Sequence, residues 1–512
     1  MKNIYKMVLV LIALSIMSSC SNFEKLNTDP NTASTVSPEM LATQLLKDTY
    51  RFWNPNPTDF SSGNLWCKHM ARLDATANPG QYYYSYYPYG GYGGLQKITN
   101  LKRMVEFAEG NPAKPSFEGL ALFLKASAGL SSTLDMGDIP YSEAGMAEDG
   151  ILRPKYDKQA DVFVEILADL KAAEAKFAEG KDFGTCDIMY GGSAAKWRKL
   201  CNAMQLKVIQ TISKKATAEQ KARFAEIVAA NNLMTGNTDN YQLVYTENPN
   251  ATHPFWNGES QRILDGVSKL VVDALKKNND YRLFYFAEPA KAKINAGLLE
   301  TDTAAYVGAP TELASSILAI NNQAGMYSLV NIRYTLYRTG DPMIKFSYAE
   351  QCFIIAEAIE EGWVTGNAQT YYENGVKAQL EYYMSLPAAS ATKDVHNMKI
   401  TQVYIDGYFA GEAAYKTSGT KDDRLHQIWT QRWLIDFFQG NGLNYQNYLR
   451  TGWPLFPLDP ATCMNPDDKN TFPKRWMYPT SEQTTNPDNY QQAVDEQYAG
   501  YDGINQVPWW LK

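Results

Sequence analysis

SFEGLALFLKASAGLSSTLDMGDIPYSEA, the stretch at residues 116–144, joins a helical pattern to the turn that ends it. Its apolar side chains recur at helical spacing: Leu120, Phe123, Leu124 and Leu134. Ser116 is a residue type that caps helix N-termini. The periodicity stops at Gly137–Ala144, where Asp138 and Pro140 are typical of a turn. The stretch therefore predicts a helix followed by a fixed turn.

The same apolar periodicity recurs along much of the chain and predicts mostly α structure. The expected helices are residues 40–49 (capped by Ser37-Pro38), 98–108, 163–177, 197–212, 260–277, 345–361, 368–384 and 421–438. Short strands are expected only at 241–245 and 327–337. Helices of this length with short loops indicate a solenoid of helical hairpins, although no strict 34-residue repeat is present.

Long loops rich in Asn, Pro, Gly and aromatic residues interrupt these helices. They cover residues 54–64, 78–94, 247–259, 287–310 and 453–487. Loops of this length usually carry function, so we expect an irregular, loop-rich subdomain on the scaffold. Because no Ser/Gly linker or run of charge divides the chain, residues 36–512 are predicted to form a single domain.

The N-terminus has the pattern of an export signal. Lys2 and Lys6 precede an apolar run at 7–17, which is too short to span a bilayer. Ser18, Ser19 and Cys20 then resemble the lipobox of bacterial lipoproteins, although Met17 stands where leucine is usual. We expect residues 1–19 to be cleaved, Cys20 to be lipidated and residues 20–35 to form a flexible leash. A plain signal peptide and a short buried helix are the alternatives.

Composition excludes several classes of function. The formal net charge of −7 argues against nucleic acid as a partner. The five cysteines after Cys20 are scattered without a CxxC pair, which disfavours both a disulfide framework and a zinc site. They are predicted to be isolated, mostly buried thiols.

No catalytic motif is present. The four histidines are isolated, and neither a GxSxG elbow nor a phosphate-binding loop occurs. The acidic pairs 422–423 and 467–468 are better explained as solvated charge than as a glycosidase pair. Asp467 and Asp468 near Asn465 could ligate Ca²⁺, but the EF-hand spacing is missing. The sequence therefore predicts no enzyme activity, no cofactor and no metal supported by a motif.

The candidate ligand site is the aromatic loop QYYYSYYPYGGYGG at residues 81–94. Glycine and proline disfavour a helix there, and aromatic rings on a loop offer flat apolar faces with hydroxyls at the edge. Sugar rings stack on such faces, and peptide side chains can dock on them equally well. The alternative is that the rings only pack the loops onto the scaffold. The predicted ligand-binding residues are Trp66, Tyr82, Tyr84, Tyr86, Tyr89, Tyr92, Trp256, Asn257, Tyr306 and Tyr327.

Four groups of residues, taken in order, resemble one protein family. They are Asn27–Asn31 (NTDPN), Gly137–Ala144 (GDIPYSEA), Tyr190-Gly191-Gly192 with Trp197 and Asn202, and Phe472–Pro479 (FPKRWMYP) with Glu482, Asn486, Tyr490 and Trp509-Trp510. Together they are similar to the SusD/RagB family of outer-membrane nutrient-binding lipoproteins, in its SusD-like branch. The resemblance covers nearly the whole mature chain.

This resemblance implies a tetratricopeptide-like scaffold with a loop-rich ligand-binding half, anchored by lipid on the outward face of an outer membrane. It also implies a SusC-like TonB-dependent transporter as partner, glycan or peptide as ligand, and no covalent chemistry. We therefore expect oligosaccharide capture for import. An oligopeptide-binding member of the same family and a surface glycoside hydrolase are the alternatives.

Overall fold

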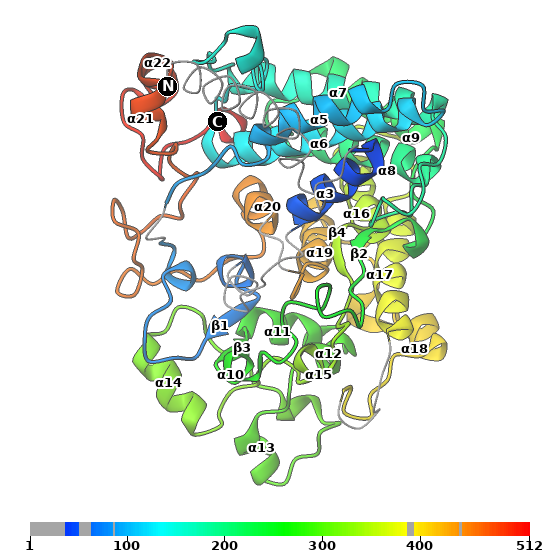
Figure 1. The fold of residues 1–512 in the computed structure, drawn as a ribbon. Helices are drawn as coiled ribbons and strands as arrows, with labels where there is room; N and C mark the ends of the chain where they lie inside the picture. Colours follow the sequence, from blue (N-terminus) through cyan, green and yellow to red (C-terminus); the bar gives the residue numbers. More distant parts are fainter. Residues whose placement is uncertain (1–35, 51–62, 85–87, 387–393, 440–442) are drawn as a thin grey trace, which may run out of the picture.

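The computed structural model describes residues 36–50, 63–84, 88–386, 394–439 and 443–512. Figure 1 shows long helices gathered in the upper and right-hand part of the molecule, and short helices, strands and loops in the lower part. The described part is mostly helical, with four short strands. The predicted fold class is confirmed.

The long helices form the scaffold. Their bounds are α3 (Pro38–Tyr50), α5 (Ile98–Phe107), α6 (Lys114–Met136), α7 (Gln159–Glu179), α8 (Ala194–Thr211), α9 (Ala218–Ala230), α16 (Tyr348–Glu360), α17 (Ala368–Ser385), α19 (Lys421–Leu434), α20 (Leu443–Thr451) and α22 (Pro487–Tyr498). Successive helices contact one another from α5 to α9, α16 pairs with α17, and α8 contacts α16. Each apolar stripe is thus buried against its neighbours, as in a stack of helical hairpins.

The shorter elements follow the same chain order. The short helices are α10 (Glu259–Arg262), α11 (Lys269–Lys277), α12 (Arg282–Phe286), α13 (Lys291–Asn295), α14 (Ser315–Gln323), α15 (Arg333–Leu336), α18 (Gln402–Gly407) and α21 (Glu482–Thr485). The 3₁₀ turns are η1 (Gly80–Tyr82), η2 (Leu95–Lys97), η3 (Ala147–Asp149), η4 (Asn237–Asp239), η5 (Thr303–Ala305), η6 (Gly411–Ala413) and η7 (Trp509–Leu511).

The helix predicted from residues 116–144 is present as α6, but Ser116 does not cap it. The helix begins two residues earlier, at Lys114-Pro115, because proline suits the first turn of a helix. Ser116 is instead buried, and its hydroxyl donates to the carbonyl oxygen of Lys181 at 2.6 Å. The helix ends as expected at Gly137, whose φ of 106° is available mainly to glycine.

Two predicted helices are interrupted by strands. Residues 260–277 contain β3 (Asp265–Val267) between α10 and α11, and residues 345–361 begin inside β4 (Met343–Phe346). In both cases a serine caps the helix after the strand: Ser268 accepts from the backbone N–H of Val271, and Ser347 from that of Glu350. In both regions the first residues form strand because they pair with a distant strand, and sequence periodicity does not show such pairing.

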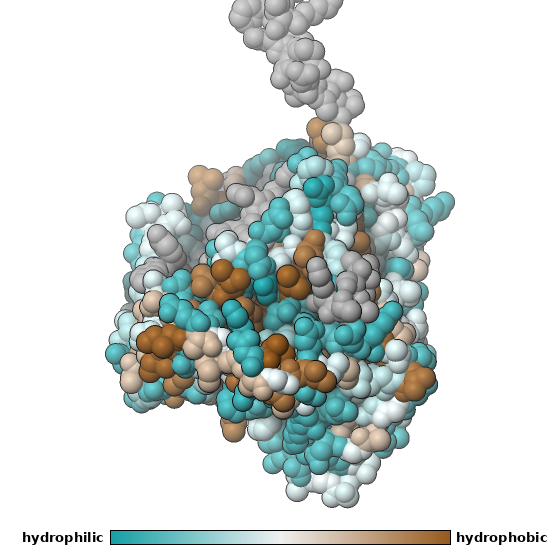
Figure 2. All heavy atoms as spheres, turned by 90° about the horizontal axis from the view of Figure 1, so that it is seen from below, coloured by the Kyte–Doolittle hydropathy of each residue, from teal (hydrophilic) through white to brown (hydrophobic). Residues whose placement is uncertain are grey.

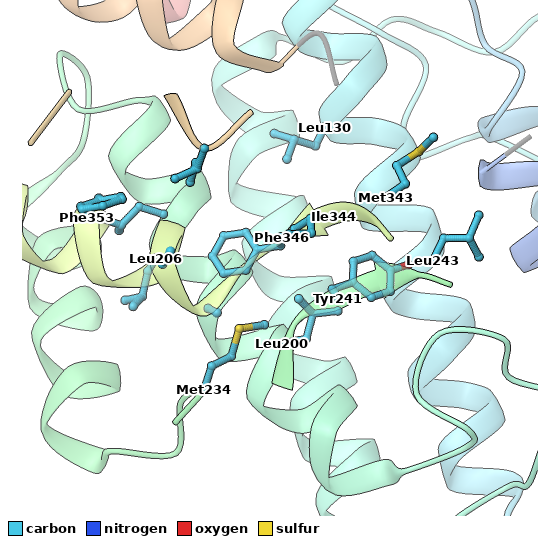
Figure 3. Close-up of a cluster of buried hydrophobic side chains, with 14 of the residues drawn as sticks. Leu130, Leu200, Leu206, Met234, Tyr241, Leu243, Met343, Ile344, Phe346 and Phe353 are labelled. Carbon is cyan, nitrogen blue, oxygen red and sulfur yellow. The ribbon is translucent and has the colours of Figure 1, made fainter. Parts of the chain in front are cut away.

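Two antiparallel pairs make up the described sheet structure. β1 (Met70–Arg72) pairs with β3, and β2 (Tyr241–Leu243) pairs with β4. The strand expected at 241–245 is therefore present, whereas the one expected at 327–337 is not: it reduces to single bridges at Leu329 and Val330 and continues into α15. Figure 3 shows Tyr241 and Phe346 of the second pair in a cluster with Leu200 and Leu206 of α8.

The five described cysteines are all free, and four of them are buried: Cys67, Cys201, Cys352 and Cys463. The prediction of isolated thiols is confirmed for the part of the chain that the structure covers. Within the same residues, no helix combines the length and apolar character needed to cross a bilayer.

The lower part of the molecule in Figure 1, which contains β1, β3 and α10 to α15 and is called the loop-rich half below, presents apolar side chains on its surface. Figure 2 views the molecule from below and shows hydrophobic patches among hydrophilic residues. Exposed apolar residues of this half are Ile263, Leu299, Ile317, Ile320 and Met326. This surface contrasts with the α16 helix, nearly all of whose side chains are buried.

The C-terminal segment is fastened to the end of α6 by a buried ion pair. The Arg475 guanidinium contacts the Asp502 carboxylate at 2.5 Å and donates to the carbonyl oxygen of Met136 at 3.1 Å. The hydroxyl of Tyr478 donates to the carbonyl oxygen of Asp138 at 2.7 Å. Two of the family-like motifs, around residues 137 and 475, therefore meet in space and hold each other.

Replacing Arg475 by methionine should strongly destabilise the fold. The change leaves the Asp502 carboxylate buried without its cation, which costs about 3–5 kcal/mol of unfolding free energy in comparable pairs. Chemical denaturation followed by circular dichroism measures this loss. The matched control is Arg103→Met, because the ion pairs of Arg103 with Glu106 and Glu148 are solvent-exposed. The control should denature almost as the wild type does. Equal effects of the two substitutions would contradict the assigned role of Arg475.

Candidate functional site

The aromatic loop lies directly on α6 because its glycines allow a close approach. A Cβ atom at Gly94 would lie 2.6 Å from the Cβ of Ala128, and one at Gly90 would lie 2.5 Å from the Cγ of Met136. Both distances are shorter than real carbon–carbon contacts. Gly91 and Gly93 face open space instead. The GGYGG sequence thus lets this loop run along the helix without side chains between them.

The first tyrosines of the loop are packing residues. The Tyr82 ring is buried, and its hydroxyl donates to the carbonyl oxygen of Leu313 at 2.6 Å. Tyr83 is also buried, with the Lys68 ammonium 3.8 Å from its ring centroid. The Lys68 amine also donates to the carbonyl oxygen of Gln81. The Tyr82 hydrogen bond ties the beginning of the loop to a segment more than 200 residues away, and the Lys68 contacts tie it to the segment just before β1.

The later tyrosines of the loop are more accessible. Tyr84 and Tyr92 are half-buried, and the Tyr92 hydroxyl lies 3.1 Å from that of Tyr156. Tyr89 is 39% exposed while its backbone bridges to Met477. Tyr86 lies outside the described residues. Tyr89 is thus the loop ring most available to a ligand among those described.

The remaining predicted residues are separate from this loop. Trp256 is half-buried beneath the Arg338 guanidinium, which lies 4.6 Å from its ring centroid, and its neighbour Asn257 is exposed. Tyr306 is fully buried and donates to the carbonyl oxygen of Glu300 at 2.8 Å. Tyr327 is buried, with its hydroxyl 2.9 Å from the Asn321 amide. In this conformation the rings of Tyr306 and Tyr327 pack the loop-rich half.

Among the predicted residues that the structure describes, only Trp66 lines the large cavity. This cavity has a volume of about 900 Å³. Its wall combines α3, α6, the glycines of the aromatic loop, β4, α20 and the segment around Trp476. The polar and aromatic lining residues are Asp48, Thr49, Trp66, Lys97, Phe123, Ser127, Ser131, Ser132, Asp135, Lys207, Tyr241, Lys345, Phe346, Tyr445, Gln446 and Trp476. The volume falls within the range of about 300–1,000 Å³ that is usual for small-molecule sites.

One wall of the cavity is aromatic. The ring centroid of Trp66 lies 5.1 Å from that of Trp476 and 5.4 Å from that of Tyr445, with both pairs edge-to-face. Such pairs hold each ring in a fixed orientation. Trp66 and Trp476 are half-buried, so part of each ring is accessible. The wall therefore offers fixed apolar ring surface to the cavity.

Trp476 is positioned by its backbone. Its N–H donates to the carbonyl oxygen of Asp135 at 2.7 Å. The next residue, Met477, donates to the carbonyl oxygen of Pro88 at 2.7 Å and accepts from the N–H of Gly90 at 2.8 Å. The C-terminal segment therefore links α6 and the aromatic loop, and it carries Trp476 between them.

Asp135 supplies a carboxyl group to the cavity wall. Burial raises the pKa of this carboxyl to about 7. At neutral pH the group is therefore partly protonated, and it can either donate or accept a hydrogen bond. It lies one helical turn after Ser131, which also lines the cavity.

The floor of the cavity is charged. Lys207 of α8 and Lys345 of β4 both reach it. The Lys207 ammonium lies 2.9 Å from the Glu350 carboxylate. Burial lowers the pKa of Lys345 to about 8, an effect that the nearby Asp436 opposes. Buried amines at the bottom of a partly aromatic cavity can recognise polar groups of a ligand.

Metal and catalytic chemistry find no support in the described residues. Among them, no group of three or more His, Cys, Asp or Glu side chains is arranged to hold a metal ion. His69 and His253 are buried, and burial lowers both pKa values to about 3. These two histidines are core residues.

Sequence reasoning missed most of the cavity. Trp476 and Tyr445 belong to segments far from the aromatic loop, and Asp135 follows the last apolar position of a helical pattern without any signal of its own. One signal did exist for Trp476: it lies inside the FPKRWMYP segment quoted for its resemblance to a family. Arg475 and Tyr478 of that segment hold the fold together, and Trp476 of the same segment contributes its ring to the cavity.

Comparisons with known proteins agree with this architecture. The family profile described as SusD-like, "Starch-binding associating with outer membrane", matches residues 30–479. A SusD homolog from Bacteroides fragilis has 36% identity and a TM-score of 0.87, covering 93% of this chain and 100% of its own. An outer-membrane protein from Bacteroides vulgatus, whose description connects it with nutrient binding, has 29% identity, a TM-score of 0.81 and the same coverage.

A solved structure described as a chitin-binding protein has 25% identity and a TM-score of 0.73, covering 93% of this chain and 100% of its own. No curated protein gives a significant match. The family profile spans most of the sequence, and the solved structures share its fold over almost the whole length. The chain belongs to the SusD-like family of outer-membrane nutrient-binding proteins, which bind their ligands without catalysis.

Proposed function

We propose that this protein captures oligosaccharides at the cell surface and delivers them to a SusC-like TonB-dependent transporter of the outer membrane. The observation that carries the ligand assignment is the cavity of about 900 Å³ with Trp66 and Trp476 on one wall. Fixed indole faces suit the apolar C–H face of a sugar ring. The neighbouring Ser131, Asp135 and Gln446 offer hydrogen-bond partners for its hydroxyls.

The shape of the cavity also favours a sugar ligand. Gly91, Gly93 and Gly94 form part of its wall and carry no side chains. A ring can therefore approach the backbone there, while the aromatic residues contact its other faces. Tyr89, exposed on the same loop, extends the aromatic surface outside the cavity. The chitin-binding description of one structural relative supports a glycan as ligand.

The N-terminal segment suits a tethered receptor. In this proposal residues 1–19 are removed, Cys20 carries the lipid, residues 20–35 form the leash and residues 36–512 form one binding domain. A short leash keeps a binding domain at high local concentration over a transporter in the same membrane. Lipidation on a single cysteine with several acyl chains anchors a protein stably.

Removing the aromatic wall should weaken oligosaccharide binding. Trp66→Ala and Trp476→Ala should each cost about 0.5–1.5 kcal/mol, roughly two- to tenfold in affinity, because each removes a stacking face. Isothermal titration with maltohexaose, cellohexaose, xylohexaose and chitohexaose identifies a binding sugar and then measures the loss. Circular dichroism verifies that each variant is folded.

Two other tryptophans serve as matched controls for this experiment. Trp363 is half-buried and packs edge-to-face on Phe224 outside the cavity, so Trp363→Ala should leave the affinity unchanged. Trp256→Ala tests the separate aromatic position in the loop-rich half. A loss with Trp256→Ala but not with the cavity variants would place the ligand elsewhere. Binding of oligopeptides in place of every sugar would refute the glycan assignment.

The lipid anchor should be needed for uptake and not for binding. Cys20→Ala removes the acylated thiol but leaves residues 36–512 unchanged, so the purified protein should bind sugar with wild-type affinity. Growth on the bound sugar should fail in cells that carry only this variant. Normal growth of those cells, with the variant confirmed as unlipidated, would show that the anchor is dispensable.

A further inference from the structure

We infer that the cavity prefers oligosaccharides carrying a carboxylate, and that Lys345 and Lys207 hold this group at the cavity floor. The inference rests on the proposed glycan-binding function and specifies its substrate class. It begins with the charged residues behind the cavity floor. These are Lys207, Lys345, Arg432 and Arg450 as cations, with Glu350, Glu357 and Asp436 as anions.

The two glutamates of this cluster are each matched by more than one cation. Glu350 lies 2.9 Å from the Lys207 ammonium and 3.2 Å from the Arg432 guanidinium. Glu357 accepts from the Arg450 guanidinium at 3.0 Å, and Arg432 lies 3.9 Å from it. Their negative charge is therefore fully compensated within the cluster.

Asp436 is the third anion, and it is only partly charged at neutral pH. Burial and the neighbouring Glu350 raise the pKa of its carboxyl to about 7. Lys345, whose pKa Asp436 helps to raise, has a pKa of about 8 and stays largely protonated. Among the described residues of this cluster the four cations outnumber the three anions, so this part of the floor carries net positive charge.

The excess charge is presented to the cavity by the two lysines. Both line the large cavity, whereas Arg432 lies behind them, along a smaller cavity of about 30 Å³ that shares Lys207. An ammonium group has three donors, so Lys207 can bind an additional acceptor while paired with Glu350. Lysine is a compact charge suited to carboxylates that approach from different directions.

The surroundings make the floor selective for charge. Leu130, Tyr241 and Phe346 also line the cavity, and Figure 3 shows these three side chains in the hydrophobic cluster of the scaffold. Charges interact more strongly beside such apolar groups than in water. Of the two described acids that line the cavity, Asp135 has its pKa raised to about 7 by burial, so its repulsion of an anion is reduced at neutral pH, and Asp48 lies 3.9 Å from the Lys97 ammonium.

The test compares each sugar acid with its methyl ester, which has the same rings without the charge. Hexamers of α-1,4-galacturonate, β-1,4-glucuronate and β-1,4-mannuronate are titrated into the full mature protein at pH 7 by calorimetry. At least one free acid should bind roughly tenfold to a hundredfold more tightly than its ester, as expected for charge-assisted hydrogen bonds. This preference should decrease as NaCl is raised.

Substitutions of Lys345 then test whether the cavity floor causes the preference for the acid over the ester. Lys345→Met should reduce the acid-over-ester ratio of affinities toward one, while Lys345→Arg should largely keep it. The control is Lys171→Met, on the exposed face of α7 and remote from the cavity lining, which should keep the full ratio. If Lys345→Met does not fold, Lys345→Gln, which is polar but uncharged, replaces it and should reduce the ratio in the same way.

The outcomes separate this inference from the proposed function. Equal binding of acids and esters, or binding of neutral hexamers alone, would overturn the carboxylate preference and leave glycan capture standing. A preference that survives Lys345→Met would overturn the assignment to the floor. Binding of a peptide free acid, with no sugar of any kind bound, would refute both.

Discussion

The backbone of residues 475–478 is the constraint on which the candidate site depends. Arg475 binds the end of α6 and the Asp502 carboxylate, Trp476 donates to the carbonyl oxygen of Asp135, and Met477 pairs with the aromatic loop. Three consecutive residues thus join helix, loop and C-terminus. Because the Arg475 ion pair is buried, separating these parts would leave a charge without its partner. The cavity is therefore held by the same contacts that hold the fold.

This arrangement explains how a helical scaffold acquires a binding site. The long helices bury their apolar faces against one another and form one side of the cavity. Loops form the other side. Glycines 90 and 94 bring the aromatic loop against α6, and the C-terminal segment inserts Trp476 beside Trp66. The floor is built from α8 and β4, whose buried lysines are stabilised by acids of α16 and by Asp436. Aromatic wall and charged floor come from separate parts of the chain, so ring stacking and charge recognition can vary independently.

The sequence predicted the helical scaffold well because apolar periodicity is a local signal: α7 and α17 follow their patterns closely. It failed at 260–277 and 345–361, where pairing across the fold converts the beginning of a helical pattern into strand. The candidate site was harder to predict from sequence, because tertiary contacts decide which side chains are exposed. The aromatic loop could be found from composition, but its Tyr82 ring is buried by a segment 231 residues away. Trp476, Tyr445, Lys207 and Lys345 enter the cavity from distant positions, and no local pattern connects them.

A crystal structure of the protein with a bound oligosaccharide tests the central claim most directly. The sugar found by titration would be soaked or co-crystallised with residues 36–512, and the electron density of the ligand located. We expect a pyranose ring stacked on Trp66 or Trp476, within hydrogen-bond distance of Asp135 or Ser131. Ligand density outside the cavity, for example at Trp256, with the cavity free of sugar, would contradict the account.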